Sequence, residues 1–303
     1  MVPVIERNNK MLRKILLASL TILALSSPSK AAQVMCATTE KTPLDTCPIG
    51  LIRGKIEKGN LKKVREFSYI QFYPKRFYLD SPGGDVDEAL EIGRFFKQFL
   101  TTTIAPSPNP ATGNYELMGR RAVCLSACAF AWFGGIQRMG DVGLHRPYFT
   151  DEEYKRMPPD QASVVYNAML DRVKAYMNEM EVPRSITEKM LSTSSGNVFM
   201  VSWLRDSLYT PPSVSEWIGA NCGKVEYKWQ PYQTDITPEQ DRKMQCESKL
   251  LTGHHFKVVE NFIRILNGEA RKKGIKMRWE FKDEPTTASS PWYCPPFIPG
   301  CKS

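Results

Sequence analysis

The stretch RFYLDSPGGDVDEALEIG, residues 76–93, constrains the fold more than any other part of the chain. Its first residues are rich in aromatic side chains, which favour a strand. SPGG at 81–84 then interrupts the strand, and Asp85 with Glu88 forms a capping-box pair typical of a helix start. Apolar residues recur on one face of that helix. The stretch therefore predicts a strand, a glycine turn and a helix, which is half of a βαβ unit.

Other segments extend this alternation. Strands are predicted around 51–56, at 67–72 and at 101–105, and helices at about 160–180, at 185–191 and at about 247–267. Ser185 and Glu188 form a second capping-box pair. Residues 106–119 are rich in proline, glycine and asparagine, which predicts a surface loop. We therefore expect an α/β architecture with a sizeable buried core.

The first 31 residues predict a secretory signal peptide. Basic residues at 7–14 precede an apolar run at 15–25, and Ser29 and Ala31 are placed for cleavage after Ala31. The apolar run is too short to span a bilayer, and no later segment approaches a spanning length. We therefore expect an exported protein, periplasmic or secreted, with no stable membrane span after the signal is removed.

The net charge of +9 gives little support for nucleic acid binding. About +4 lies within residues 1–31 and about +4 within 222–303, so the segment between them is nearly neutral. The C-terminal part interleaves Lys and Arg with acidic residues, as a solvated surface does, and forms no phosphate-binding stripe. We expect no nucleic acid partner.

The eight cysteines all follow the predicted signal peptide, and an even number in an exported chain favours disulfides. Neighbouring positions suggest the pairs Cys36–Cys47, Cys124–Cys128, Cys222–Cys246 and Cys294–Cys301. A zinc site is the competing interpretation, but no pair has CxxC spacing and the chain has only three histidines. We expect no metal and no cofactor.

Ser126 and His145 are the candidate catalytic pair. Ser126 stands between two cysteines among small residues, and read alone this setting is more typical of packing than of chemistry. A single histidine is also more often structural. However, His145 ends an apolar, strand-like run, and α/β proteins place reacting groups at such strand ends. A histidine base activates a serine hydroxyl for acyl transfer.

Backbone N–H groups would complete such a site. A helix that begins at Ser126 directs the Ala127 N–H toward an oxyanion formed at the serine. The glycines of SPGG, Gly83 and Gly84, allow a second N–H to approach the substrate without an intervening side chain. These residues form the predicted oxyanion hole.

Three blocks of the sequence, LDSPGGDVDEALEIG, CLSACAFAWFGG and GLHRPYF, occur in the order that is found in the Clp/crotonase superfamily. The chain resembles in particular the proteolytic subunit of Clp protease and its periplasmic relatives, over about residues 50–220. The resemblance implies a ββα superhelical fold. Because relatives assemble into rings or stacks, it also leaves open whether this chain forms a homo-oligomer. It implies these roles: nucleophile Ser126, base His145, and oxyanion hole Gly83, Gly84 and Ala127.

The chain departs from the family pattern at two places. Cys128 occupies the position of a glycine two residues after the serine. The third member of the family's triad is a downstream aspartate, but the corresponding stretch here, LSTSSGNVFMVS, contains no carboxylate. Thr193 is the candidate third residue, with Ser194 as the alternative, and Asp206 and Asn197 are nearby. A hydroxyl stabilises an imidazolium less than a carboxylate does.

These features predict a signal peptide at 1–31, a Clp/crotonase-like domain at 32–221 and a small, basic, disulfide-closed appendage at 222–303. The favoured function is an exported serine hydrolase, a Clp-like peptidase that acts on peptides or proteins without a partner ATPase. One alternative is a catalytically inactive member of the fold that binds or scaffolds. Another is an acyl-CoA-processing enzyme of the crotonase type, which export disfavours because CoA is a cytosolic cofactor.

Overall fold

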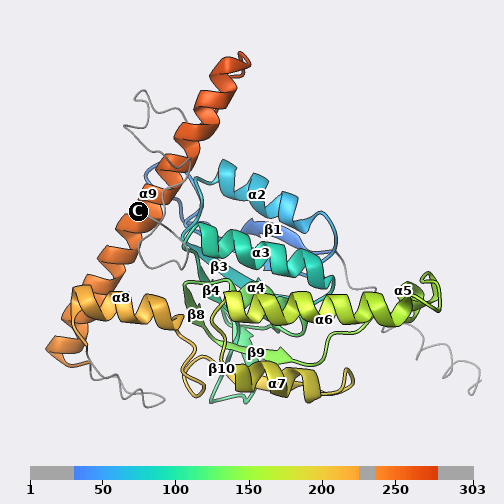
Figure 1. Ribbon diagram of the computed structural model, residues 1–303. Helices are drawn as coiled ribbons and strands as arrows, with labels where there is room; N and C mark the ends of the chain where they lie inside the picture. Colours follow the sequence, from blue (N-terminus) through green and yellow to red (C-terminus); the bar gives the residue numbers. More distant parts are fainter. Residues whose placement is uncertain (1–30, 225–235, 279–303) are drawn as a thin grey trace, which may run out of the picture. The chain divides into compact units, whose positions relative to one another are not determined.

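Figure 1 shows the computed structural model, which describes residues 31–224 and 236–278. The predicted signal peptide therefore lies outside the described residues except for Ala31, and so does the predicted Cys294–Cys301 pair. Ala31 forms a parallel bridge with Lys55, and Ala32 is fully buried. Ala31 and Ala32, on the two sides of the predicted cleavage position, are thus part of the folded chain.

A five-stranded sheet forms the centre of the described chain. Its strands, in spatial order, are β1 (Gln33–Cys36), β2 (Ile49–Arg53), β3 (Arg76–Asp80), β4 (Thr102–Ile104) and β8 (Gln137–Met139). β1 pairs antiparallel with β2, and the remaining neighbours pair in parallel. The carboxyl ends of the parallel strands therefore share one edge, where α/β proteins place the loops that carry chemistry.

Helices connect these strands: α2 (Asn60–Ile70), α3 (Val86–Gln98) and α4 (Ala127–Phe133). α3 begins as predicted, because the Asp85 carboxylate accepts the Glu88 N–H at 2.9 Å. Every residue of α4 is buried, as expected for a helix within a core. α3 and α4 approach so closely that a Cβ at Gly93 would lie 2.9 Å from the Phe130 carbonyl oxygen. This contact fixes α4 against the rest of the core.

The strand predicted at 67–72 is wrong, because residues 67–70 form the last turn of α2. Val64 and Ser68 are buried one helical turn apart, and Phe67 packs edge-on against Phe77 at 6.0 Å between ring centroids. The aromatic composition favours a strand locally, but burial against β3 at helical spacing decides the conformation.

Residues 106–119, predicted as a surface loop, are more ordered than expected. They contribute to a small antiparallel sheet of β5 (Ser107–Pro108), β6 (Tyr115–Leu117) and β7 (Arg120–Arg121). Leu117 and Ala122 pack with Leu51 of β2 in a second, smaller apolar cluster. This sheet leads directly into the segment that carries Ser126.

A separate antiparallel pair is formed by β9 (Asp141–Leu144) and β10 (Phe199–Ser202). Between them lie α5 (Asp151–Lys155), α6 (Ala162–Glu179) and α7 (Arg184–Ser192), of which α6 and α7 match predicted helices. The capping box predicted for α7 is wrong. Its N-cap is Pro183, which makes no side-chain cap bond, and Glu188 pairs with Arg184 at 2.7 Å.

The C-terminal helices are α8 (Pro212–Cys222) and α9 (Pro238–Lys272), which the Cys222–Cys246 disulfide joins. α9 is longer than the helix predicted at 247–267, and its buried residues Leu251, Val259 and Ile263 belong to the main apolar core. The described part of the predicted appendage thus shares that core, and the boundary at 221/222 stays a prediction. Within the described ranges, no helix combines the length and the hydropathy that a membrane span requires.

Candidate active site

The segment that follows β3 lies beside the segment that carries Ser126. The Ser81 N–H donates to the Val123 carbonyl at 2.7 Å, and the Leu125 N–H donates back to the Ser81 carbonyl at 3.0 Å. Ser81 and Cys124 therefore form a parallel bridge, which extends the sheet pairing beyond β3. The first two of the three sequence blocks are thus adjacent in space.

The same segment is bound on its other side to β9. The Gly143 N–H donates to the Cys124 carbonyl at 2.9 Å, and the Ser126 N–H donates to the Gly143 carbonyl at 2.7 Å. Gly143 is closely packed, since a Cβ there would lie 2.5 Å from Val198 Cγ1 and neighbouring side chains would have to shift. His145 follows two residues later, so the third block joins the other two at this edge.

Ser126 occupies a strained turn between the bridge at Cys124 and the start of α4. Its φ of 55° and ψ of −125° are unusual for a residue with a side chain, and such conformations cost about 1–3 kcal/mol and cluster at functional sites. Ser126 is the N-cap of α4, but its hydroxyl makes no cap hydrogen bond. A serine on a sharp strand-to-helix turn is the arrangement that exposes a nucleophile.

Gly83 lies directly against this turn. It has a φ of 101°, and a Cβ there would lie 2.7 Å from Ser126 Cβ and 3.0 Å from the Ala127 nitrogen. Only glycine permits this approach of two backbones. The Gly83 carbonyl accepts the Ile56 N–H at 2.8 Å, which fixes the glycine turn from its other side.

The predicted oxyanion donors are not equivalent. The Gly83 N–H donates to Ser81 Oγ at 3.1 Å. The Gly84 and Ala127 N–H groups, by contrast, donate to no acceptor among the residues that the structure describes. Backbone donors without an acceptor are suited to stabilising the negative charge of a tetrahedral intermediate, and of these two the Ala127 N–H follows Ser126 directly.

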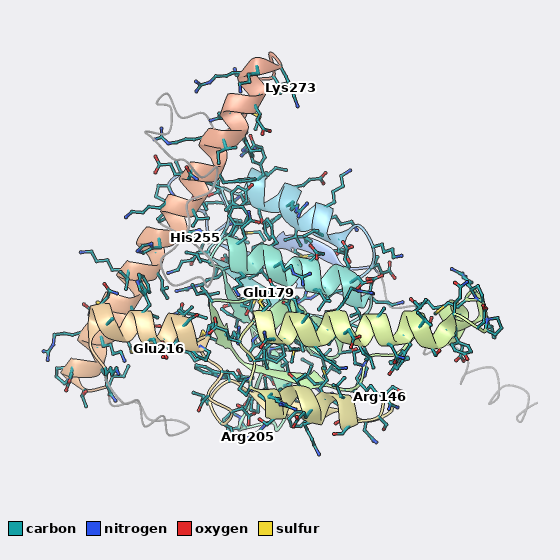
Figure 2. All side chains as sticks on the ribbon, in the orientation of Figure 1. Arg146, Glu179, Arg205, Glu216, His255 and Lys273 are labelled. Carbon is teal, nitrogen blue, oxygen red and sulfur yellow. A yellow bond between two sulfur atoms is a disulfide. The ribbon has the colours of Figure 1, made fainter. Side chains whose placement is uncertain are left out.

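His145 follows the end of β9 and is only 8 % exposed. Its Nδ1 lies 2.9 Å from the carbonyl oxygen of Arg146, whose position near α7 is visible in Figure 2. A carbonyl oxygen can only accept, so this contact assigns the proton of the neutral ring to Nδ1. Nε2 then carries the lone pair that a general base requires.

The structure places Ser126 and His145 on adjacent backbone segments, but no hydrogen bond between Ser126 Oγ and His145 is present among the described residues. Catalytic hydrogen bonds are often long in the absence of substrate. The expectation that the two groups lie near hydrogen-bonding distance stays a prediction.

Neither hydroxyl predicted as a third triad member bonds to His145. Thr193 Oγ1 donates to the Lys189 carbonyl at 2.8 Å, and Ser194 Oγ accepts the Asn197 amide at 2.9 Å. Thr193 contributes instead through its main chain, because its carbonyl accepts the Arg146 N–H at 2.9 Å. Arg146, whose carbonyl orients the His145 ring, is therefore held at Thr193 through its own N–H.

Two carboxylates in the flanking sequence, Asp206 and Asp141, are engaged elsewhere. Asp206 accepts the Ser202 N–H at 2.8 Å and pairs with Arg205 at 2.9 Å. Asp141 begins β9, at the opposite end from His145, and burial raises the pKa of its carboxyl group, in spite of a hydrogen bond from Ser202. The acceptor at His145 is thus a backbone carbonyl, a group that sequence reasoning missed because every residue has one. The only sequence signal is Pro147, which restricts Arg146 to an extended conformation.

Three of the four predicted disulfides fall within the described residues, and all three are formed: Cys36–Cys47, Cys124–Cys128 and Cys222–Cys246. The second of them brackets Ser126, with 5.2 Å between its Cα atoms. A covalent bond thus links the β-bridge residue before Ser126 to the first turn of α4 after it.

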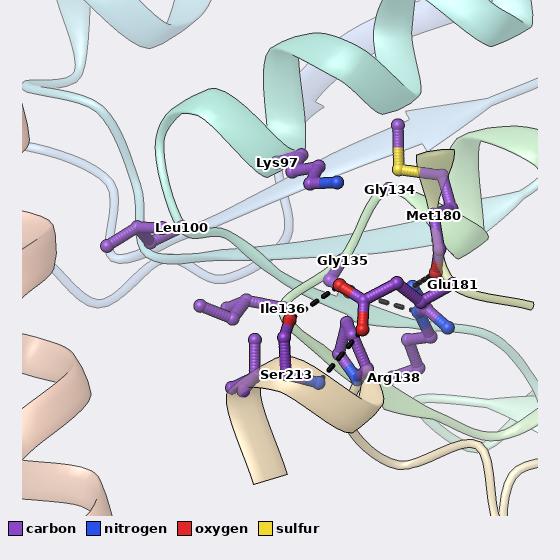
Figure 3. A pocket seen from close by; sticks show the side chains of 11 residues that line it. Lys97, Leu100, Gly134, Gly135, Ile136, Arg138, Met180, Glu181 and Ser213 are labelled. Atoms are coloured by element: carbon purple, nitrogen blue, oxygen red, sulfur yellow. Dashed lines mark hydrogen bonds between the residues drawn. The ribbon is translucent and has the colours of Figure 1, made fainter. Parts of the chain in front are cut away.

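A cavity of about 20 Å³ lies at the other end of α4 (Figure 3). Gly134 and Gly135 line it together with Arg138, which donates to the Gly135 carbonyl at 3.0 Å and to the Met180 carbonyl at 2.7 Å. The cavity has room for about one water molecule. None of the predicted site residues lines it, so it is separate from the candidate active site.

No protein-family model matches the chain, and no curated protein matches it. Solved structures are similar to parts of it, and two of them are described here. A point mutant of ClpP1 from Listeria monocytogenes is 14 % identical over 53 % of this chain and 85 % of its own, with a TM-score of 0.37. A point mutant of the 1510-N membrane-bound stomatin-specific protease is 17 % identical over 57 % and 83 %, with a TM-score of 0.36. Because both TM-scores are below 0.5, the function is inferred below from the chain's own geometry.

Proposed function

We propose that this chain is an exported serine hydrolase, a peptidase that uses Ser126 as nucleophile and His145 as base. One observation carries the proposal: a strained serine turn lies between a glycine turn and the strand that leads to the histidine. The N–H groups of Ala127, which follows the serine, and of Gly84, which follows the glycine packed against it, donate to no acceptor among the described residues. A turn with only a packing role would not need to combine these features.

The residues have distinct roles in the proposed reaction. Ser126 Oγ attacks the scissile carbonyl while His145 Nε2 accepts the hydroxyl proton, and the Gly84 and Ala127 N–H groups bind the oxyanion. His145 then returns the proton to the leaving amine, and a water molecule releases the acyl group by the same steps in reverse order. The Arg146 carbonyl keeps the ring oriented. It is neutral, so it stabilises the imidazolium less than a carboxylate does, and we expect slow turnover.

The cellular setting in this proposal follows from the N-terminal sequence and the disulfides. A signal peptide at 1–31 would deliver the chain to the periplasm or the exterior, where disulfides persist. No ATP is available there to drive a partner ATPase, so substrates are peptides or proteins that reach the site unaided. A homo-oligomer is compatible with this function but is not required by it.

Labelling with a fluorophosphonate probe tests the proposed nucleophile. We expect labelling of the wild-type protein and none of Ser126→Ala. Ser215→Ala is the matched control, because Ser215 is an exposed serine in α8 and should label like the wild type. Circular dichroism and thermal melting establish that all three proteins are folded. Failure to label folded wild-type protein would contradict the proposal.

A binding or scaffold role is the second candidate, and a specific observation favours it: no carboxylate contacts His145 among the described residues. In that case the site would retain peptide affinity without turnover. The two functions differ in the probe experiment, since a binding protein leaves the probe unreacted at Ser126.

A further inference from the structure

The Cys124–Cys128 disulfide encloses the proposed nucleophile and one oxyanion donor. The ring that it closes contains Leu125, Ser126 and Ala127. Both cysteines are buried, with 2 % and 1 % of their surface exposed. Both belong to the main apolar core, so the disulfide ties the site to that core.

The backbone inside this ring depends on support from outside the serine itself. Ser126 has a φ of 55°, which residues with side chains disfavour, and its hydroxyl does not cap α4. A covalent link across so short a segment removes most of its alternative conformations. The disulfide is thus placed to hold the conformation that the serine alone would leave.

Each end of the disulfide is anchored to a different part of the fold. Cys124 is bridged to Ser81 on one side, and its carbonyl accepts the Gly143 N–H on the other. Cys128 lies in the first turn of α4, with its N–H donated to the Leu125 carbonyl at 3.0 Å. The bond consequently fixes the start of α4, and with it the Ala127 N–H, relative to the glycine turn and β9.

We propose that Cys124 and Cys128 are positioning residues for the hydrolase, and that turnover depends on the oxidised state of their disulfide. The inference rests on the proposed function of Ser126. Opening the bond needs a dithiol reductant. The reductant loses two electrons and two protons as it becomes a disulfide, and the two cysteines gain them as thiols. Ser126 is chemically unchanged, but its geometry is released.

A comparison of two double variants tests this role. Cys124→Ala with Cys128→Ala removes the disulfide at the site, and Cys222→Ala with Cys246→Ala removes the one between α8 and α9 as the matched control. With an activated ester such as p-nitrophenyl acetate, we expect kcat of the first variant to fall about 10²-fold, the effect of a displaced catalytic group, with little change in KM. The control variant should lose stability against urea but keep kcat.

A purely structural role of Cys124–Cys128 predicts the opposite result: a loss of stability without a loss of kcat. If the first variant loses stability but keeps the wild-type kcat for the folded fraction, the inference is wrong, while labelling at Ser126 leaves the proposed function intact. If oxidised, folded wild-type protein does not label at all, the proposed function fails and this inference fails with it.

Reduction of the wild-type protein covers the case in which the first variant does not fold. The protein is treated with dithiothreitol, alkylated at intervals and mapped by mass spectrometry to follow each disulfide. The fluorophosphonate labelling rate should fall in proportion to opening of Cys124–Cys128 and recover on reoxidation. Full labelling of folded protein in which this bond is open would overturn the inference.

Discussion

Two buried histidines differ in how their ring nitrogens are used: His145 lies near the carboxyl ends of the parallel strands, and His255 lies near their amino ends. His145 has one nitrogen at a carbonyl, the Arg146 oxygen, and no hydrogen bond to its other nitrogen among the described residues. His255 of α9 (Figure 2) has both nitrogens at carbonyls, 2.6 Å from Phe99 and 3.0 Å from Tyr73. Both histidines are buried, so in the proposed function the unengaged nitrogen is what distinguishes the base, His145, from a histidine with a structural role.

The surroundings of the two histidines, which we call the His145 edge and the His255 edge of the sheet, differ in the same way. At the His255 edge, polar groups bind one another: Gln137 donates to Glu247 at 2.8 Å, and Lys75 donates to Thr252 at 2.5 Å. Burial raises the pKa of Glu247 and lowers that of Lys75 to about 8. At the His145 edge, two backbone N–H donors are left without described acceptors. The polar contacts of the His255 edge thus hold α9 against the sheet, whereas the His145 edge is suited to binding a substrate.

The largest expected effect is the difference in fluorophosphonate labelling between the His145→Ala and His255→Ala variants. His145→Ala should reduce fluorophosphonate labelling about 10²–10⁴-fold, the usual contribution of a general base, with the thermal midpoint nearly unchanged. His255→Ala should keep labelling but lower the free energy of unfolding by about 2–4 kcal/mol, because it opens a cavity and leaves buried carbonyls unpaired. Equal loss of labelling in both variants would break the distinction between the edges.

Substituting alanine for Gly83 and, separately, for Gly59 tests whether the close contact of Gly83 with the Ser126 turn matters for the reaction. Gly83 and Gly59 both have positive φ, but of these two only Gly83 has neighbours within reach of a Cβ, at Ser126 and Ala127. Gly83→Ala should reduce labelling about 10²-fold by displacing the nucleophile turn. Gly59→Ala should cost about 1 kcal/mol of stability and leave labelling unchanged. Similar labelling of the two variants would mean that the contact at Gly83 has no part in the reaction.

The pH dependence of stability tests the His255 edge. Burial lowers the pKa of His255 to about 4, although the hydrogen bonds to Phe99 and Tyr73 favour the charged form. Between pH about 4 and the ordinary value of 6.5, the unfolded chain binds more protons than the folded one. The stability contribution is therefore complete above pH 6.5 and is lost as the pH falls, by at most about 1.4 kcal/mol per pH unit.

Urea unfolding at several pH values, with His255→Gln beside the wild type, isolates this slope. The wild type should lose more stability than the variant between the ordinary histidine pKa of 6.5 and the folded value of about 4. Parallel curves for the two proteins would show that His255 does not titrate as its burial implies, and that the polar contacts outweigh desolvation.

The smallest expected effect is at Thr193. Its hydroxyl donates to Lys189, while only its carbonyl reaches Arg146. Thr193→Val keeps the carbonyl and should change the labelling rate less than about threefold, in line with an ordinary substitution near the surface. A loss comparable to that of His145→Ala would reinstate the Thr193 hydroxyl as the third triad member.

The sequence indicated which residues form the candidate site, but it did not indicate the contacts that connect them. The glycine turn, Ser126 and His145 were recognisable because their order and local composition are specific. Long-range pairing then brings them together through the bridges at Ser81 and Gly143. The acceptor at His145 was not predictable, since a backbone carbonyl has no residue type.

Two parts of the fold were missed for different physical reasons. Residues 67–70 have the composition of a strand, but burial of Val64 and Ser68 at helical spacing makes them part of α2. α9 was predicted only in part, and its packing through His255 against carbonyl groups that follow α2 and α3 depends on contacts far apart in the sequence. Local patterns contain no information about such contacts.

The most direct test of the central claim is the location of the adduct after reaction with a fluorophosphonate. The folded wild-type protein is labelled, digested under non-reducing conditions and sequenced by tandem mass spectrometry. We predict a single adduct on Ser126, within the peptide that contains the Cys124–Cys128 disulfide. An adduct on another serine, or none on folded and oxidised protein, would contradict the assignment of Ser126 as nucleophile.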